Sequence, residues 1–211
     1  MTRLIHLLSR RLAPIAAALA LGACASAPTH YYTLVAPAPA AGAVAPAAVA
    51  PGLPFELLPV SVPAQDDQPQ LVVRQGGQGV ALLDGHRWIA PLGDEIRGAL
   101  SADLAQALGR PDVSGLAHEG ARVARIKVDV RRFDSQPGSY ALLEAAWSVR
   151  VMGGDAPERT LACTSRFNQA VSGAGYDALV QAHQQALGQL AGEVAAAVRA
   201  LADGSASCPG G

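Results

Sequence analysis

The sequence predicts a single-domain α/β protein: a mixed, largely antiparallel sheet of about six or seven strands, covered by two long amphipathic helices. Residues 91–108 and 176–201 repeat apolar side chains at three- and four-residue steps, which is the spacing of one helix face. Between them, three segments alternate apolar and polar residues and are joined by short turns, a pattern typical of antiparallel strands. Half of the 211 residues are apolar and 16% are charged, a composition sufficient for one buried core.

Seven segments are rich in the β-branched and aromatic residues that strands favour, and they cover 30–35, 55–62, 71–74, 80–88, 125–131, 143–151 and 161–167. The alternation is clearest in the fifth segment, where every second residue from Ile126 to Val130 is apolar. Turns at 134–139 and 153–157 join the last three segments, so we expect an antiparallel meander there.

The two helices have recognisable ends. Pro91 suits the first turn of its helix, because the N–H that proline lacks would have no partner there. Asp94 and Glu95 follow, where their charge meets the positive end of the helix dipole. Gly109 and Gly204 are the predicted stops, since glycine readily adopts the left-handed conformation that ends helices.

The start of the chain has the features of a secretory signal. Two adjacent arginines precede an apolar run over 12–21, which is shorter than the ~20 residues of a membrane-spanning helix. The order Leu-Gly-Ala-Cys at 21–24 matches the bacterial lipobox, in which the cysteine thiol receives a diacylglycerol and becomes the first residue of the mature chain. We therefore expect a signal peptide at 1–23 and a lipid on Cys24. The alternative is an ordinary signal peptide with a cysteine nearby.

Lipidation would tether the mature chain to a membrane without a spanning segment. One acyl chain holds marginally, whereas several hold durably. Ala25 stands where an aspartate would indicate retention at the inner membrane, so we expect the outer membrane of a Gram-negative cell. The expected organisation is a lipidated tether at 24–29, one domain at 30–204 with a Pro/Ala-rich loop at 36–54, and a tail at 205–211.

Two cysteines remain once Cys24 is assigned to the lipid: Cys163 and Cys208. In an oxidising compartment such an even pair is a candidate disulfide. The alternative is that Cys163 is a small buried residue and that Cys208 is a free thiol on a loose tail.

No catalytic, metal-binding or cofactor-binding pattern is recognisable. The histidines do not pair with each other or with a cysteine at metal spacing, and no nucleophile elbow or phosphate-binding glycine loop is present. We expect His183 to be a core residue, and Asp66 and Asp67 to form a solvated turn rather than a catalytic pair. Loss of three arginines with the signal peptide takes the formal charge from −1 to −4, so nucleic-acid binding is not expected.

Arg87 and Trp88 are a candidate partner contact, since both residue types are enriched in binding hot spots and they lie at a strand-to-helix junction. The alternative is that Trp88 packs beneath the helix start and that Arg87 is solvated. The sequence leaves both possibilities open.

Several motifs occur in one order along the mature chain. They are the lipobox, Tyr31-Tyr32-Thr33-Leu34, the segment from Pro63 through Asp67-Gln68-Pro69-Gln70-Leu71-Val72-Val73-Arg74, His86-Arg87-Trp88, and the hairpin of Arg132-Phe133-Asp134 with Trp147. This order resembles the PqiC-type family of ABC-transport auxiliary lipoproteins over essentially the whole mature chain. One departure is Gln68, where the family has an arginine, so a salt bridge from that side chain is not expected here.

The resemblance implies a non-enzymatic periplasmic subunit that is anchored in the outer membrane. It also implies partners: a tunnel-forming MCE-domain protein and inner-membrane transporter components, which together move lipids across the envelope. We further expect a homo-oligomer, because a collar around a tube needs several copies and cyclic symmetry closes such a set. The alternative is a stand-alone envelope lipoprotein, either a lipid-binding module or a hydrolase.

Overall fold

The computed structural model describes residues 28–37, 52–117, 120–173, 175–205 and 207–208. These residues form the strands β1 (His30–Tyr32), β2 (Phe55–Leu57), β3 (Gln70–Arg74), β4 (Val80–Trp88), β5 (Val123–Gln136), β6 (Tyr140–Met152) and β7 (Arg159–Ala170), and the helices α2 (Leu92–Leu108) and α3 (Tyr176–Asp203). The predicted signal peptide, Cys24 and most of the Pro/Ala-rich loop lie outside the described residues.

The strands are divided between two sheets. The larger sheet has the order β2-β5-β6-β7, with β5, β6 and β7 antiparallel and β2 parallel to β5. The smaller sheet has the order β1-β4-β3, with β1 parallel and β3 antiparallel to β4. The predicted α/β class, two long helices and largely antiparallel strand order are confirmed. The difference is that the strands lie in two sheets rather than in one.

The division occurs along β5. The first half of β5 bonds to β2, and one further bridge joins Ser61 to Asp129. The register with β6 then shifts between Val130 and Arg132, which marks a bulge that bends the strand. Beyond the bulge, β3 meets β5 through the ion pair of Arg74 with Asp134 instead of a ladder. Alternation in the sequence identifies a strand but not its neighbour, so this division could not be predicted.

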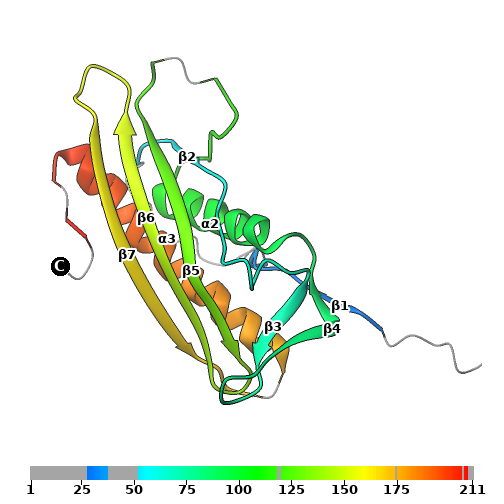
Figure 1. The fold of residues 1–211 in the computed structure, drawn as a ribbon. Helices are drawn as coiled ribbons and strands as arrows, with labels where there is room; N and C mark the ends of the chain where they lie inside the picture. Colours follow the sequence, from blue (N-terminus) through cyan, green and yellow to red (C-terminus); the bar gives the residue numbers. More distant parts are fainter. Residues whose placement is uncertain (1–27, 38–51, 118–119, 174, 206, 209–211) are drawn as a thin grey trace, which may run out of the picture.

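The two helices lie side by side on one face of the four-stranded sheet, with α3 along β6 and β7 (Figure 1). Their apolar faces and the inward faces of the strands form one main core. Among its fully buried large side chains are Phe55, Leu57, Ile96, Leu100, Leu104, Leu108, Ile126 and Leu143. The opposite face of that sheet carries charged side chains such as Arg125 and Lys127, and neither α2 nor α3 covers it.

The element ends agree closely with the sequence. α2 begins at Leu92, one residue later than predicted, so Pro91 is the residue just before the helix. Asp94 and Glu95 lie in the first helical turn. Gly109 and Gly204 both adopt the left-handed conformation, at φ of 61° and 95°, and end the two helices as predicted. The meander strands are longer than the alternation indicated, because β5 continues through Gln136 into a tight turn.

Candidate functional site

The predicted lipidation residue, Cys24, lies outside the described residues, and the described chain begins at Pro28, just before β1. In the described ranges, the helices are all too short or too polar to cross a membrane. The first strand of the described chain is β1, so its contacts are considered first.

A cluster of aromatic and histidine rings holds β1 against β4 and α3. The Tyr32 hydroxyl lies 2.8 Å from Nδ1 of His86, and the His30 ring stacks on His86 with centroids 5.2 Å apart. The Tyr176 ring at the start of α3 lies 4.4 Å from the same His86 ring. Burial raises the pKa of Tyr32, and the charge of Asp177 adds to the shift, so the phenol stays neutral. Three elements that are distant in sequence are thus tied together at His86.

Glu95 ties down the chain that follows β1. Its carboxylate accepts hydrogen bonds from the Thr33 hydroxyl and the Leu34 backbone N–H, both at 2.8 Å, and the residue is buried. The sequence identified Glu95 only as an acidic residue in a first helical turn. Its pairing with a segment about sixty residues earlier is a tertiary contact that no local pattern shows.

The two residues of the candidate partner contact, Arg87 and Trp88, differ in their exposure to solvent. Trp88 is only 6% exposed and meets Phe133 edge-on, with centroids 6.1 Å apart. Arg87 is partly exposed, and its Nε lies 3.4 Å from the backbone oxygen of Asp84. Trp88 therefore packs under the junction, which was the second possibility in the sequence, and only Arg87 remains at the surface.

Two neighbouring side chains that the sequence did not single out are far more exposed than Trp88. Tyr31 is 60% exposed and pairs in register with Arg87, and Ile89 is 61% exposed. The Ile89 backbone N–H bonds to the Tyr32 carbonyl at 2.9 Å, so Ile89 follows directly along the same junction. Strand alternation offered a signal, because adjacent tyrosines in a strand must point to opposite faces.

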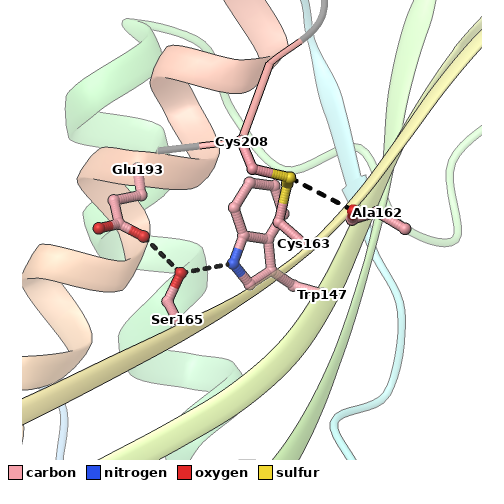
Figure 2. Close-up of a disulfide and its surroundings, with 6 residues drawn as sticks. All are labelled: Trp147, Ala162, Cys163, Ser165, Glu193 and Cys208. Atoms are coloured by element: carbon pink, nitrogen blue, oxygen red, sulfur yellow. Dashed lines mark hydrogen bonds between the residues drawn. A yellow bond between two sulfur atoms is a disulfide. The ribbon is translucent and has the colours of Figure 1, made fainter. Parts of the chain in front are cut away.

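Cys163 on β7 and Cys208 in the tail are joined by a disulfide, with Cα atoms 5.7 Å apart (Figure 2). The Cys208 sulfur lies 3.4 Å from the carbonyl oxygen of Ala162. Beside it, the Trp147 indole N–H donates to the Ser165 hydroxyl at 2.8 Å, and Ser165 donates to the Glu193 carboxylate. The bridge and this chain of bonds fasten the tail, β7 and α3 to one another.

Asp66 differs from the sequence-based expectation. The predicted turn exists, because the Asp66 and Asp67 N–H groups both bond to the Pro63 carbonyl, and Asp67 is exposed. Asp66 itself is only 8% exposed and lines a pocket of about 220 Å³ between β3, β4 and β5. The expected solvated pair is therefore wrong for Asp66, because the chain packs that side chain against the three-stranded sheet.

The same pocket holds an ion-pair cluster around Asp134. Arg74 contacts Asp134 at 2.6 Å and Arg132 contacts it at 2.9 Å. Burial alone would raise the pKa of Asp134, but the hydrogen bonds and charges of the two arginines outweigh it, so the pKa lies below its usual value. Asp66 has the opposite balance: burial, helped by the charge of Asp134 and opposed by Arg74, raises its pKa to about 6.

Ser135 and His183 form a serine–histidine pair, with Oγ and Nε2 2.8 Å apart. Both are buried, and the His183 ring stacks on Phe133 with centroids 3.8 Å apart. The other ring nitrogen, Nδ1, has no hydrogen-bond partner among the described residues. Burial lowers the pKa of His183 to about 3, so the ring is neutral. A catalytic histidine needs an orienting partner and access to substrate, and His183 is better described as the predicted core residue.

A second hollow on the surface is wide and open. A depression of about 670 Å³ lies over β5, β6 and β7 next to the disulfide, lined in part by Lys127, Asp129 and Arg131. Within the described ranges, no three histidine, cysteine or acidic side chains lie close enough together to hold a metal ion.

The sequence also matches a protein-family model. The model described as the ABC-type transport auxiliary lipoprotein component matches residues 32–195, from β1 into α3. The chain belongs to this family. The order of motifs noted in the sequence therefore indicated the correct family, and the two helices and both sheets are the fold of an auxiliary lipoprotein domain.

Solved structures share this fold. A crystal structure of an uncharacterized protein superposes with a TM-score of 0.62 at 16% identity, covering 81% of this chain and 98% of that one. The crystal structure of protein XCC0632 from Xanthomonas campestris superposes with a TM-score of 0.53 at 18% identity, covering 78% and 92% of the two chains. Such identities support the fold alone. A comparison with curated proteins gave no match.

The raised pKa of Asp66 predicts a pH-dependent effect of Asp66→Asn. The folded state binds the Asp66 proton more tightly, so the stability it adds is present below about pH 4 and is lost as pH rises through about 6. We expect Asp66→Asn to raise the free energy of unfolding by about 2–3 kcal/mol at about pH 8, relative to its effect at about pH 4. Urea unfolding of both proteins across this range measures the difference.

Asp67→Asn is the matched control, because Asp67 lies in the same turn but is exposed. We expect it to change stability by less than about 0.5 kcal/mol at either pH. His183 contributes with the opposite sign: its stabilisation is present above about pH 6.5 and lost as pH falls towards about 3. The difference between the variants therefore reports on Asp66 more directly than the dependence of wild-type stability on pH. Equal effects of Asp66→Asn on stability at both pH values would contradict the raised pKa of Asp66.

Proposed function

We propose that the mature chain is an outer-membrane lipoprotein, held by lipid on Cys24, that acts as a non-catalytic docking subunit of an MCE-type lipid transport system between the inner and outer membranes. The family match over residues 32–195 carries this proposal, since it makes the chain an auxiliary component of ABC-type transport. The Leu-Gly-Ala-Cys order at 21–24 supports the anchor.

The surface chemistry of the described residues supports docking over an internal binding role. The larger depression is open and lies over the charged face of the four-stranded sheet, where Lys127, Asp129 and Arg131 line it. The smaller pocket combines the ion-paired residues Arg74, Arg132 and Asp134 with apolar side chains, and its volume of about 220 Å³ lies below the ~300–1,000 Å³ that ligand pockets usually have. Acyl chains are bound in concave sites that enclose most of the ligand, which an open depression does not do, whereas exposed faces with charged side chains favour partner choice and orientation.

The proposal includes partners and self-association. A tunnel-forming MCE-domain protein and inner-membrane transporter components are the partners that the sequence resemblance implied. Several copies of the domain would surround such a tunnel, because cyclic symmetry closes a ring without leaving unpaired surfaces.

The anchor is tested by Cys24→Ser. We expect the substitution to prevent acylation and to lower the fraction of protein that sediments with outer membrane by more than ~10-fold, because the acyl chains that would hold the protein at that membrane are lost. Cell fractionation with immunodetection measures this. Sedimentation of the variant at the wild-type level would contradict the anchor.

The docking role is tested on residues 25–211, produced without the signal peptide and the lipid so that the protein can be handled without detergent. We expect it to co-purify with the MCE-domain protein of the same cell and to have a solution mass of several copies. A strictly monomeric chain that captures no envelope partner but hydrolyses a lipid or ester would replace this proposal by the hydrolase alternative.

A further inference from the structure

Three side chains at the β1–β4 junction have the chemistry of a membrane-contact surface. Among the described residues, Tyr31 and Ile89 are large apolar side chains that are about 60% exposed, and Arg87 lies in register with Tyr31. We propose that Tyr31, Arg87 and Ile89 rest on the phospholipid bilayer that holds the Cys24 lipid, and so fix the orientation of the domain. This inference rests on the lipid anchor in the proposed function.

The length of the tether places this surface near the bilayer. His30, the first residue of β1, is six residues beyond Cys24. A fully extended chain of that length spans about 20 Å. β1 therefore cannot be further than about 20 Å from the acylated residue, so the start of the domain stays close to the bilayer that holds the lipid. The next strand of the described residues, β2, begins only at Phe55, so its distance from the anchor is far less constrained.

The chemistry of the three residues fits a phospholipid interface. Tyrosine rings favour the headgroup region, because the ring is apolar and the hydroxyl remains hydrated. Ile89 adds an apolar side chain beside it. Among the described residues Arg87 forms no ion pair, since its Nε contacts only the backbone oxygen of Asp84, so its guanidinium is available to a lipid phosphate.

The surface is also preorganised. The Ile89 N–H bonds to the Tyr32 carbonyl and the Trp88 N–H bonds to the Pro69 carbonyl, both at 2.9 Å. The Tyr32–His86 contact and the burial of Trp88 hold the strand from the other face. Little backbone freedom would therefore be lost on contact with the membrane.

A second exposed apolar group provides a matched comparison. Val80 and Leu82 are 55% and 49% exposed and lie on the other half of β4, beyond the irregular register that follows Gln70 on β3. They have similar exposure and apolar character but are not adjacent to the strand that receives the tether. If exposure alone led to membrane contact, both groups would respond equally to lipid.

The experiment uses the acylated full chain in vesicles of phosphatidylethanolamine and phosphatidylglycerol, with and without brominated acyl chains. Tyr31→Trp and Leu82→Trp are compared, and the signal of the native tryptophans is subtracted using the unsubstituted chain. We expect the tryptophan added at position 31 to be blue-shifted in vesicles and quenched by brominated lipid at least ~2-fold more than the one added at position 82. Arg87→Gln should reduce the dependence of this quenching on phosphatidylglycerol.

The outcomes separate this surface from the anchor. If the chain floats with vesicles but both added tryptophans are quenched equally, the contact surface is wrong and the anchor stands. The same conclusion follows if the tryptophan added at position 31 becomes shielded from solvent only after a protein partner is added, because the surface then binds that partner and not the bilayer. If the chain does not float with vesicles, the anchor is wrong and the contact surface is overturned with it.

Discussion

Removing both bridged cysteines, as Cys163→Ala with Cys208→Ser, is expected to lower the free energy of unfolding by about 3–4 kcal/mol. The bridge closes a loop of 45 residues, and in the chain-entropy model such a loop restricts the unfolded chain substantially. It also holds the tail against β7, where Cys163 is buried beside Trp147. Chemical unfolding in the Cys24→Ser background, which leaves only these two cysteines, measures the loss.

The single variants distinguish a bridge from two separate thiols. If the bridge exists, Cys208→Ser alone removes it and costs nearly as much as the double variant, so the two effects are strongly non-additive. If the thiols are free, the exposed Cys208→Ser change should cost less than about 0.5 kcal/mol. Intact mass after alkylation provides an independent measurement: modification of two thiols without prior reduction would contradict the disulfide.

Local patterns predicted most of the elements because the physical causes of those elements are local. The apolar steps of α2 and α3 and the alternation around Val128 follow from helix and strand periodicity. Gly109 and Gly204 were identified as stops because few other residues tolerate the left-handed conformation. The family was also accessible from sequence, since its motifs lie in one order along the chain.

The parts that sequence reasoning missed depend on contacts between distant segments. The division into two sheets occurs at a bulge in β5, beyond which Arg74 of β3 pairs with Asp134 of β5. Arg74 and Asp134 are about sixty residues apart in the sequence. Asp66 looks like any acidic turn residue until β3 and β5 enclose it. Arg87 and Trp88 were treated as a pair, but alternation places adjacent strand residues on opposite faces, so only one of them can be exposed.

Phe133→Ala is expected to cost about 3–5 kcal/mol of unfolding free energy, the range for truncating a buried phenylalanine. Phe133 lies on β5 where both sheets meet α3: its ring stacks on His183 and meets Trp88 edge-on. Truncation therefore opens a cavity among three elements rather than within one. Urea unfolding measures the loss, and Phe133→Leu, which keeps most of the volume, should cost less than about 1.5 kcal/mol.

The same substitution should change the titration of His183, which separates the loss of this contact from general destabilisation. Burial lowers the pKa of His183 to about 3 in the intact core. Removing the Phe133 ring would let water approach the unpartnered Nδ1, so the pKa should rise towards its usual value, and a water bound there would moderate the cost towards the lower end of the range. NMR titration of the folded variants decides the point. A stable Phe133→Ala protein whose His183 titrates as in the wild type would show that the stacked ring does not shield the histidine.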